Sequence, residues 1–282
     1  MLEKKTCMDF NETLKTSISL DEFLLECMRN FNLFLELLIE HSNIPIKDLI
    51  LKYSQKLESM EISSVKNEIL KNMNLDYSDK NSLNNYQEII PLIENSILQF
   101  LKFKEKYEVN FSFGQKLAVF HEDYLRAGFF SLYYLAYTLI DFTTRDFVLD
   151  LARKFSDAMF ERYYQKVITK KNTINELAEM LYKNGCLKTH NFIVQIDHGK
   201  CFVKVVRCMY AEVYSELPDL ELACMLDCYG DYSKMPYNNP DFVLSRTKTM
   251  VEGYPYCDFL YYDKRYFSEI EHPDEDFWEG FE

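Results

Sequence analysis

The sequence predicts an α+β fold: a helical N-terminal region followed by a small antiparallel sheet with packed helices, in the order β-β-α-α-β-β. Apolar residues recur at helical spacing through residues 1–185. Five of the seven prolines and four of the seven glycines lie after residue 190, where the apolar period shifts toward two. We therefore expect a helical region at 1–185, an α+β domain at 186–265 and a loosely attached acidic tail at 266–282.

The helical region contains two capping boxes, in which serine or threonine and glutamate satisfy free backbone donors at a helix start. Ser19-Leu-Asp-Glu22 opens a helix that we expect to reach about His41. Thr173-Ile-Asn-Glu176 opens another, which Asn184-Gly185 ends. Between them we expect a polar loop at Leu75–Asn85 and helices at Ile46–Met60, Tyr86–Tyr107, Gln115–Phe142 and Thr143–Ile168.

The α+β domain begins with a predicted hairpin. Alternating apolar residues from Phe192 to Ile196 and from Cys201 to Val205 flank a turn at His198-Gly199. Helices are then expected at Met209–Leu217 and Pro218–Tyr229. Strands are expected at Val243–Glu252 and Tyr256–Tyr262, joined by the turn Gly253-Tyr-Pro255.

Composition excludes several classes of function. The formal net charge of −13 over 282 residues opposes nucleic-acid binding, which needs a basic surface. The uncharged run Ala127–Ile140 is shorter than the roughly 20 residues of a membrane span, so we expect a buried helix and no membrane partner. The first ten residues lack the apolar core of a signal peptide, which predicts a cytoplasmic protein with mostly reduced cysteines. The oligomeric state is not predictable.

The segment after Phe192 carries a family resemblance. The run Cys208 … Glu216-Leu-Pro-Asp-Leu-Glu221 … Cys224-Met-Leu-Asp227 … Asn239-Pro240 … Arg246-Thr247-Lys-Thr249 … Gly253-Tyr-Pro-Tyr-Cys257-Asp258-Phe259 resembles the L-2-amino-thiazoline-4-carboxylic acid hydrolase family. Residues 192–262 carry the resemblance, and they are also similar to vinyl-reductase-type small-molecule-binding domains. The resemblance implies hydrolytic opening of a sulfur-containing, amidine-like ring.

Cys224, Asp227 and Cys228 would share one face of a helix. A Cys224 thiolate that attacks the C2 carbon of an aminothiazoline, with the Asp227 carboxylate moving protons, is a workable hydrolysis. The alternatives are that the two cysteines pack as small apolar side chains and that Asp227 lies on the surface at a helix end.

Cys208 and Cys257 are substitute nucleophiles, although Cys208 follows an apolar strand and packing explains it equally well. Cys257 and Asp258 point to opposite faces of one strand, so only one of them faces a given pocket. Arg246 suits a substrate carboxylate, which a guanidinium holds through two parallel hydrogen bonds. Its alternative is a surface arginine paired with Glu252 or Asp258. Asp258 is a further candidate for substrate binding.

We expect no cofactor. Zinc is an alternative if Cys208, Cys224 and Cys257 cluster and Asp227 or His198 completes four ligands. The absence of a Cys-x-x-Cys pair argues against it.

The sequence thus predicts a hydrolase that acts on C–N bonds of cyclic amidines, with a small sulfur- and nitrogen-containing heterocyclic carboxylate as substrate. Aromatic side chains of the N-terminal helices would wall its pocket. One alternative is a non-catalytic small-molecule-binding or accessory protein. Another is a biosynthetic tailoring enzyme that runs a different reaction on the same fold.

Overall fold

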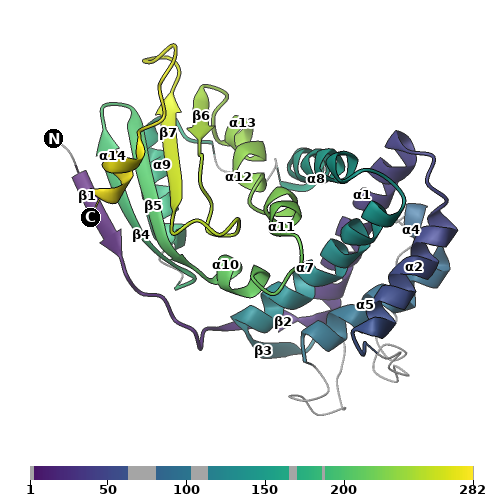
Figure 1. Ribbon diagram of the computed structural model, residues 1–282. Helices are drawn as coiled ribbons and strands as arrows, with labels where there is room; N and C mark the ends of the chain where they lie inside the picture. Colours follow the sequence, from purple (N-terminus) through teal and green to yellow (C-terminus); the bar gives the residue numbers. More distant parts are fainter. Residues whose placement is uncertain (1–2, 63–80, 103–113, 165–169, 186–187, 282) are drawn as a thin grey trace. The chain divides into compact units, whose positions relative to one another are not determined.

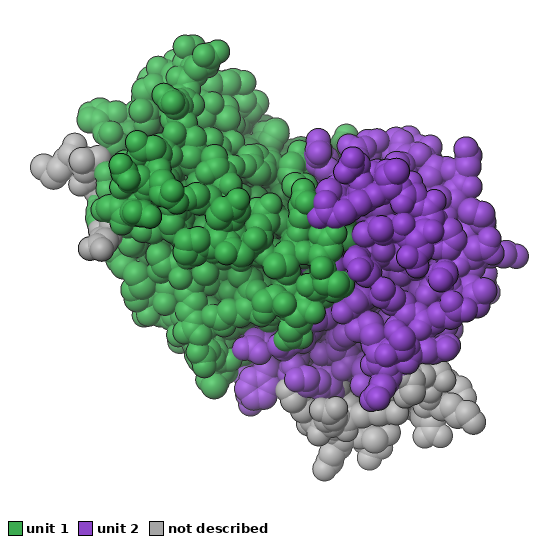
Figure 2. Space-filling view, viewed as in Figure 1, with its two compact units in different colours: residues 1–14, 159–282 green, residues 15–158 purple. Residues whose placement is uncertain are grey.

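The computed structural model describes residues 3–62, 81–102, 114–164, 170–185 and 188–281 (Figure 1). The chain forms two compact units, one of residues 15–158 and one that combines residues 1–14 with 159–282 (Figure 2). We call them the helical unit and the sheet unit. An antiparallel sheet packed with helices confirms the α+β class. The predicted boundaries at residues 185 and 265 come from composition and stay a prediction.

The sheet unit is built on a five-stranded antiparallel sheet with the strand order β1-β4-β5-β7-β6. Its strands are β1 (Glu3–Cys7), β4 (His190–Asp197), β5 (Lys200–Cys208), β6 (Phe242–Ser245) and β7 (Cys257–Asp263). Its helices are the π-helix η3 (Phe160–Tyr164), α9 (Ile174–Gly185), α10 (Met209–Tyr214), α11 (Leu220–Leu226), α12 (Gly230–Ser233), α13 (Met235–Asn238) and α14 (Glu275–Glu279).

The helical unit holds the remaining elements. They are β2 (Lys15–Ser19), α1 (Leu20–His41), α2 (Ile46–Ser59), α4 (Asn81–Asn85), η1 (Gln87–Ile89), α5 (Ile90–Phe100), β3 (Lys116–Phe120), α7 (His121–Thr138), η2 (Leu139–Asp141) and α8 (Arg145–Met159). Strands β2 and β3 form an antiparallel pair. Within the described residues, no helix combines the length and apolar character that crossing a membrane requires.

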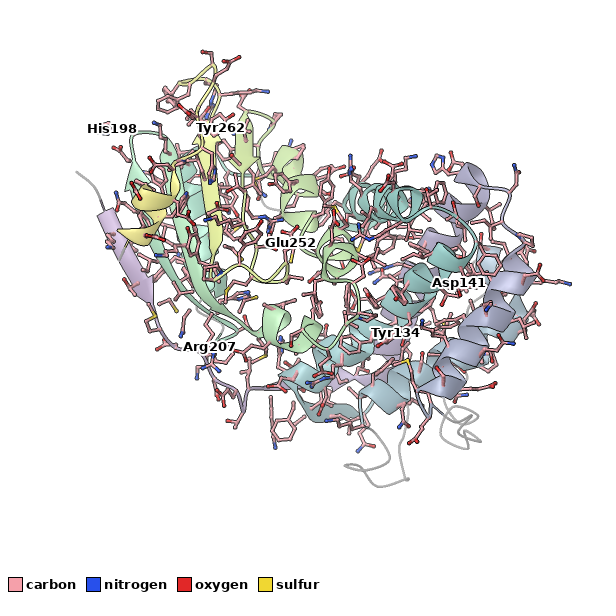
Figure 3. The ribbon with its side chains drawn as sticks, viewed as in Figure 1. Tyr134, Asp141, His198, Arg207, Glu252 and Tyr262 are labelled. Carbon is pink, nitrogen blue, oxygen red and sulfur yellow. The ribbon has the colours of Figure 1, made fainter. Side chains whose placement is uncertain are left out.

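The β4–β5 hairpin is confirmed. Asp197 pairs with Lys200 across the turn, where His198 and Gly199 have φ of +40° and +82°. Glycine adopts such angles at no steric cost, and histidine is enriched there among other residues. His198 lies at the tip of the hairpin (Figure 3).

Alternation along the strands gives the sheet two apolar faces. We call the first the α9 face, because Val203 and Cys257 pack there in one buried cluster with Leu177 of α9. We call the second the α14 face, because Phe202 and Leu260 pack there with Trp278 of α14.

The predicted helical N-terminal region also contains strands that its helical pattern did not reveal. Strand β1 pairs with β4, which lies near the start of the last third of the chain (Glu3↔Ile196), as Figure 1 shows. The run Gln115–Phe142 begins as strand β3 and becomes helical only at His121. Five-residue strands carry little local signal, and their pairing depends on distant partners.

One of the two predicted capping boxes forms in part, because Glu176 accepts from the N–H of Asn172 instead of that of the N-cap Thr173. Thr173 Oγ1 accepts from the Glu176 backbone N–H (3.2 Å), while Glu176 reaches back to the N–H of Asn172 (2.9 Å). Ser19 stands at the N-cap of α1, but its hydroxyl donates to Asp21 and caps no backbone N–H.

The prediction of a loosely attached tail is wrong. Asp274 caps α14 by accepting from the backbone N–H of Phe277 (3.0 Å). Trp278 and Phe281 are only 1% and 5% exposed on the α14 face. The acidic residues are the solvent side of a short amphipathic helix.

Several other predicted elements change length. Helix α8 ends at Met159, α5 covers only 90–100 of the predicted 86–107, and residues 81–85 of the predicted loop are helical. Residues 75–80, 103–107 and 165–168 of these predictions lie outside the described residues. The predicted strand 243–252 leaves the sheet after Ser245, and residues 246–256 form the β6–β7 loop.

Candidate functional site

The candidate thiols and carboxylate lie at the end of α11. The helix stops at Leu226 with Asp227 as its C-cap, so Cys224, Asp227 and Cys228 do not share one helical face as expected. The chain nevertheless continues in turns, with Tyr229 N–H donating to the Cys224 carbonyl (2.9 Å). The thiols stay adjacent: a hydrogen bond with Cys224, together with burial, raises the pKa of Cys228 well above its usual value.

Cys224 is hydrogen-bonded to a residue of the β6–β7 loop. The thiol is 3% exposed, and its Sγ lies 3.6 Å from Thr249 Oγ1. Thr249 Oγ1 in turn lies 2.7 Å from Glu252 Oε2. The Thr249 hydroxyl donates its single proton to Glu252, so it accepts from the thiol. Glu252, which Figure 3 labels, is exposed, so a hydrogen-bonded path runs from the buried thiol to a surface carboxylate.

Asp227 carries an unusual carboxylate. Burial raises its pKa from 3.8 to about 6, against the opposing effect of a hydrogen bond from Tyr214 Oη (3.0 Å). Tyr214 is itself 2% exposed. A carboxyl group with this pKa exists in both protonation states near neutral pH, which suits it to proton transfer.

Asp231, four residues later, is the opposite case. Burial raises its pKa, but the positive charges of Lys234 and Arg246 outweigh that effect and hold it below 3.8. Arg246 Nη1 donates to Asp231 Oδ2 at 2.9 Å, and Lys234 Nζ donates to Oδ1. The surroundings therefore shift the pKa values of these two neighbouring carboxyl groups apart. This difference suits Asp227 to proton transfer and keeps Asp231 charged.

Arg246 is buried and fixed. Its side chain is 5% exposed, and Nη2 donates to the Cys228 carbonyl (3.2 Å). The guanidinium carbon lies 5.2 and 5.1 Å from the ring centroids of Tyr232 and Phe259. Its acidic partner is Asp231, not Glu252 or Asp258 as the surface alternative expected. Arg246 therefore connects the β6–β7 loop to the turn that holds the thiols.

Cys208 and Cys257 lie in the apolar cluster of the α9 face. Burial raises the pKa of Cys208 to about 12, and burial likewise raises that of Cys257 above its usual value. Cys257 Sγ also accepts from the backbone N–H of Met250 (3.2 Å). Thiols in such surroundings resist ionisation, which favours a packing role.

Asp258 faces the other side of the strand, as alternation predicts. It is 1% exposed and accepts from the backbone N–H groups of Thr247 (2.9 Å) and Lys248 (2.7 Å). It also accepts from the Thr247 hydroxyl and contacts His272. The structure therefore does not bring Asp258 together with Cys224 and Asp227.

The zinc alternative finds no ligand set within the residues that the structure describes, where no three His, Cys, Asp or Glu side chains are arranged to hold a metal ion. His198 is 86% exposed at the hairpin tip and contacts the neighbouring Asp197 (2.6 Å). Cys186 lies outside the described residues.

Sequence reasoning missed two residues that shape the site, Tyr214 and Asp231, and gave no catalytic role to Thr249 and Glu252. Asp231 follows Asp227 by one helical turn, a spacing that would have suggested it. Thr249 falls within the predicted strand 243–252, but the strand ends at Ser245, so Thr249 belongs to the β6–β7 loop.

Comparison with known proteins supports the resemblance seen in the sequence. Residues 127–261 match the L-2-amino-thiazoline-4-carboxylic acid hydrolase family. The matched range contains Cys208, Cys224, Asp227, Arg246 and Cys257. No curated protein and no solved structure gives a significant match to the chain.

Proposed function

We propose that this protein is a hydrolase that opens a small cyclic amidine carboxylate of the aminothiazoline type, with Cys224 as nucleophile and Asp227 as the acid and base. The family match supports the reaction class. One observation carries the residue assignment. The thiol of Cys224 has a hydrogen-bonded path to Glu252, and Asp227, three residues after Cys224, has a carboxyl pKa of about 6.

The reaction would proceed in two halves. The Cys224 proton passes through the Thr249 hydroxyl to Glu252, and the thiolate adds to C2 of the ring. The electron pair of the C=N bond moves to the ring nitrogen, which takes the proton of Asp227. The exocyclic amino group then becomes an imine and gives one proton to that nitrogen as the bond between C2 and the nitrogen breaks. The ring opens with a free amine, and the carbon stays on the Cys224 sulfur. Asp227 then deprotonates a water, the hydroxide attacks that carbon, and the Cys224 thiolate leaves and recovers its proton from Glu252 through Thr249.

Arg246 would hold the substrate carboxylate. A guanidinium has five N–H donors, and the described contacts of Arg246 to Asp231 and Cys228 use two of them. The ion pair with Asp231 holds the Arg246 guanidinium in place and neutralises part of its positive charge.

The test is hydrolysis of 2-amino-thiazoline-4-carboxylate by purified protein. Cys224→Ser and Asp227→Asn should each lower kcat at least about 100-fold without lowering the melting temperature, because each removes a group that transfers protons or forms a bond. Cys208→Ala is the matched control and should retain most of the activity. Loss of activity in the control, with full activity in Cys224→Ser, would move the nucleophile to Cys208.

A non-catalytic binding protein is the second candidate. The raised pKa of Cys208, Cys228 and Cys257 favours it, because such thiols are poor nucleophiles. Calorimetric binding of the same compound without turnover, equal in the parent protein and in Cys224→Ser, would support this function and reject the hydrolase.

A further inference from the structure

A second group of reactive side chains lies on the α14 face of the sheet unit. Ser245 ends the edge strand β6, Asp258 lies on β7, and His272 comes from the segment before α14. Ser245 Oγ is 2.9 Å from His272 Nδ1, and His272 Nε2 is 3.0 Å from Asp258 Oδ2. The three side chains therefore form one continuous hydrogen-bonded chain.

The direction of each hydrogen bond follows from Asp258. Burial raises the pKa of this carboxyl. Hydrogen bonds from His272 and Thr247 and from the backbone N–H groups of Lys248 and Thr247 lower the pKa by more, so the net pKa is below 3.8. The ionised carboxylate only accepts, so it fixes the proton of His272 on Nε2. In the neutral imidazole, Nδ1 is then the unprotonated nitrogen, and it accepts from the Ser245 hydroxyl.

The surroundings hold the histidine in this orientation. Its ring stacks on the indole of Trp278 with centroids 5.7 Å apart and an interplanar angle of 24°. The His272 side chain is 13% exposed, whereas Asp258 is 1% exposed. Within the described residues, the buried Trp278 Nε1–H has no hydrogen-bond partner. A ligand atom that accepts a hydrogen bond from this group would make binding more favourable.

We propose that Ser245, His272 and Asp258 form a second nucleophilic site, which takes small acyl esters. A hydroxyl bonded to a histidine that a buried carboxylate orients is the arrangement of serine hydrolases, which is recognised by geometry rather than by sequence order. Here Nδ1 accepts from the serine and Nε2 donates to the carboxylate. Ser245 and His272 would act on the substrate, and Asp258 is a positioning residue.

The reaction is a two-step acyl transfer. His272 Nδ1 takes the Ser245 proton as Oγ forms a bond to the ester carbonyl carbon. The bond from that carbon to the alcohol oxygen breaks, and the alcohol leaves with the proton from His272. Water then attacks the acyl-serine, His272 takes its proton and returns it to Ser245, and the carboxylic acid is released.

This site is separate from the proposed cysteine site. Cys257 and Phe259 face the α9 side, where Arg246 covers the Phe259 ring, while Asp258 between them faces α14. Reactivity at Ser245 should therefore not depend on Cys224.

The experiment is labelling of the full chain with a fluorophosphonate, followed by peptide mass spectrometry. Ser245 should be modified at least about 10-fold faster than Ser215, an exposed serine whose hydroxyl donates to the Glu212 carbonyl (2.7 Å). Asp258→Asn should lower the Ser245 rate at least about 100-fold in protein that still folds, because the amide favours the wrong tautomer of His272.

His272→Phe keeps a ring against Trp278 and removes both nitrogens, so it gives the same answer if the asparagine variant does not fold. It should also abolish labelling at Ser245. Equal rates at Ser245 and Ser215, or an Asp258→Asn protein that labels as fast as the parent, would overturn the proposal. The three residues would then serve only to anchor the segment before α14.

Discussion

Asp227 and Asp231 lie four residues apart, yet their surroundings shift their pKa values in opposite directions. Burial dominates at Asp227 and raises its pKa from 3.8 to about 6. Lys234 and Arg246 overcome burial at Asp231 and lower its pKa. A pKa difference between the folded and unfolded states makes stability depend on pH. Replacing Asp227 or Asp231 by asparagine should therefore change the stability of the protein in opposite directions.

Asp227→Asn should stabilise the protein above pH 6. The folded state holds the Asp227 proton more tightly than the unfolded chain, so stability falls as pH rises from about 4 through 6. A shift from 3.8 to about 6 corresponds to at most about 3 kcal/mol. Urea unfolding should show a gain of about 1–3 kcal/mol at pH 7.5 and none at pH 4. A variant that is less stable than the parent at pH 7.5 would contradict the assignment.

The matched control is Asp231→Asn. Its parent carboxylate has a lowered pKa, so the stability it contributes is present above the unfolded value of 3.8 and is lost as pH falls through the folded value. This substitution should destabilise the protein at pH 7.5, and the loss should shrink on acidification. The proposed enzyme would thus retain a destabilising carboxylate at Asp227 because catalysis requires it, a common compromise between stability and activity.

At the residue scale, the sequence predicted which chemical groups come together but not how they are connected. Cys224, Asp227 and Arg246 do lie near one another. Their partners Thr249 and Asp231 were missed, because both contacts depend on the path of the β6–β7 loop. That path is set by where β6 stops pairing with β7, which depends on the whole sheet rather than on local propensity.

At the element scale, the structure makes α14 an integral part of the sheet unit. Trp278→Ala should destabilise the protein by about 3–5 kcal/mol, the usual cost of truncating a buried aromatic side chain. Tyr266, 73% exposed in the segment that precedes α14, provides the control, and Tyr266→Ala should change stability by less than about 0.5 kcal/mol. Urea unfolding at pH 7 compares the two. Equal stability of both variants would mean that the tail is loosely attached after all.

Elements with strong local signals were predicted well. The β4–β5 hairpin combines two alternating strands with a turn at His198-Gly199, all within 20 residues. Strands β1, β2 and β3 have five residues each and find their partners at long sequence separation, so periodicity alone did not reveal them. The tail was misjudged because its acidic residues outweigh Trp278 and Phe281 in any average over composition.

At the scale of the whole molecule, the sheet unit is discontinuous in sequence. Residues 1–14 belong with residues 159–282, and the 144 residues of the helical unit separate them. The sheet cannot be complete until the last third of the chain is available to β1. The edge of β4 is then covered by β1, and Cys7, 3% exposed, joins the cluster of the α9 face.

Removing residues 1–10 should therefore weaken the sheet unit selectively. Without β1, the backbone groups of β4 that pair with it become a bare sheet edge, which exchanges amide protons faster and promotes aggregation. Hydrogen-exchange mass spectrometry should show at least about 10-fold faster exchange in residues 190–197, while α5 and α7 of the helical unit keep their protection. Met8→Ala, at a position 53% exposed just beyond β1, is the control and should leave both regions unchanged. If α5 and α7 lose protection together with β4, the two units unfold as one cooperative body, and the separation into units has no energetic counterpart.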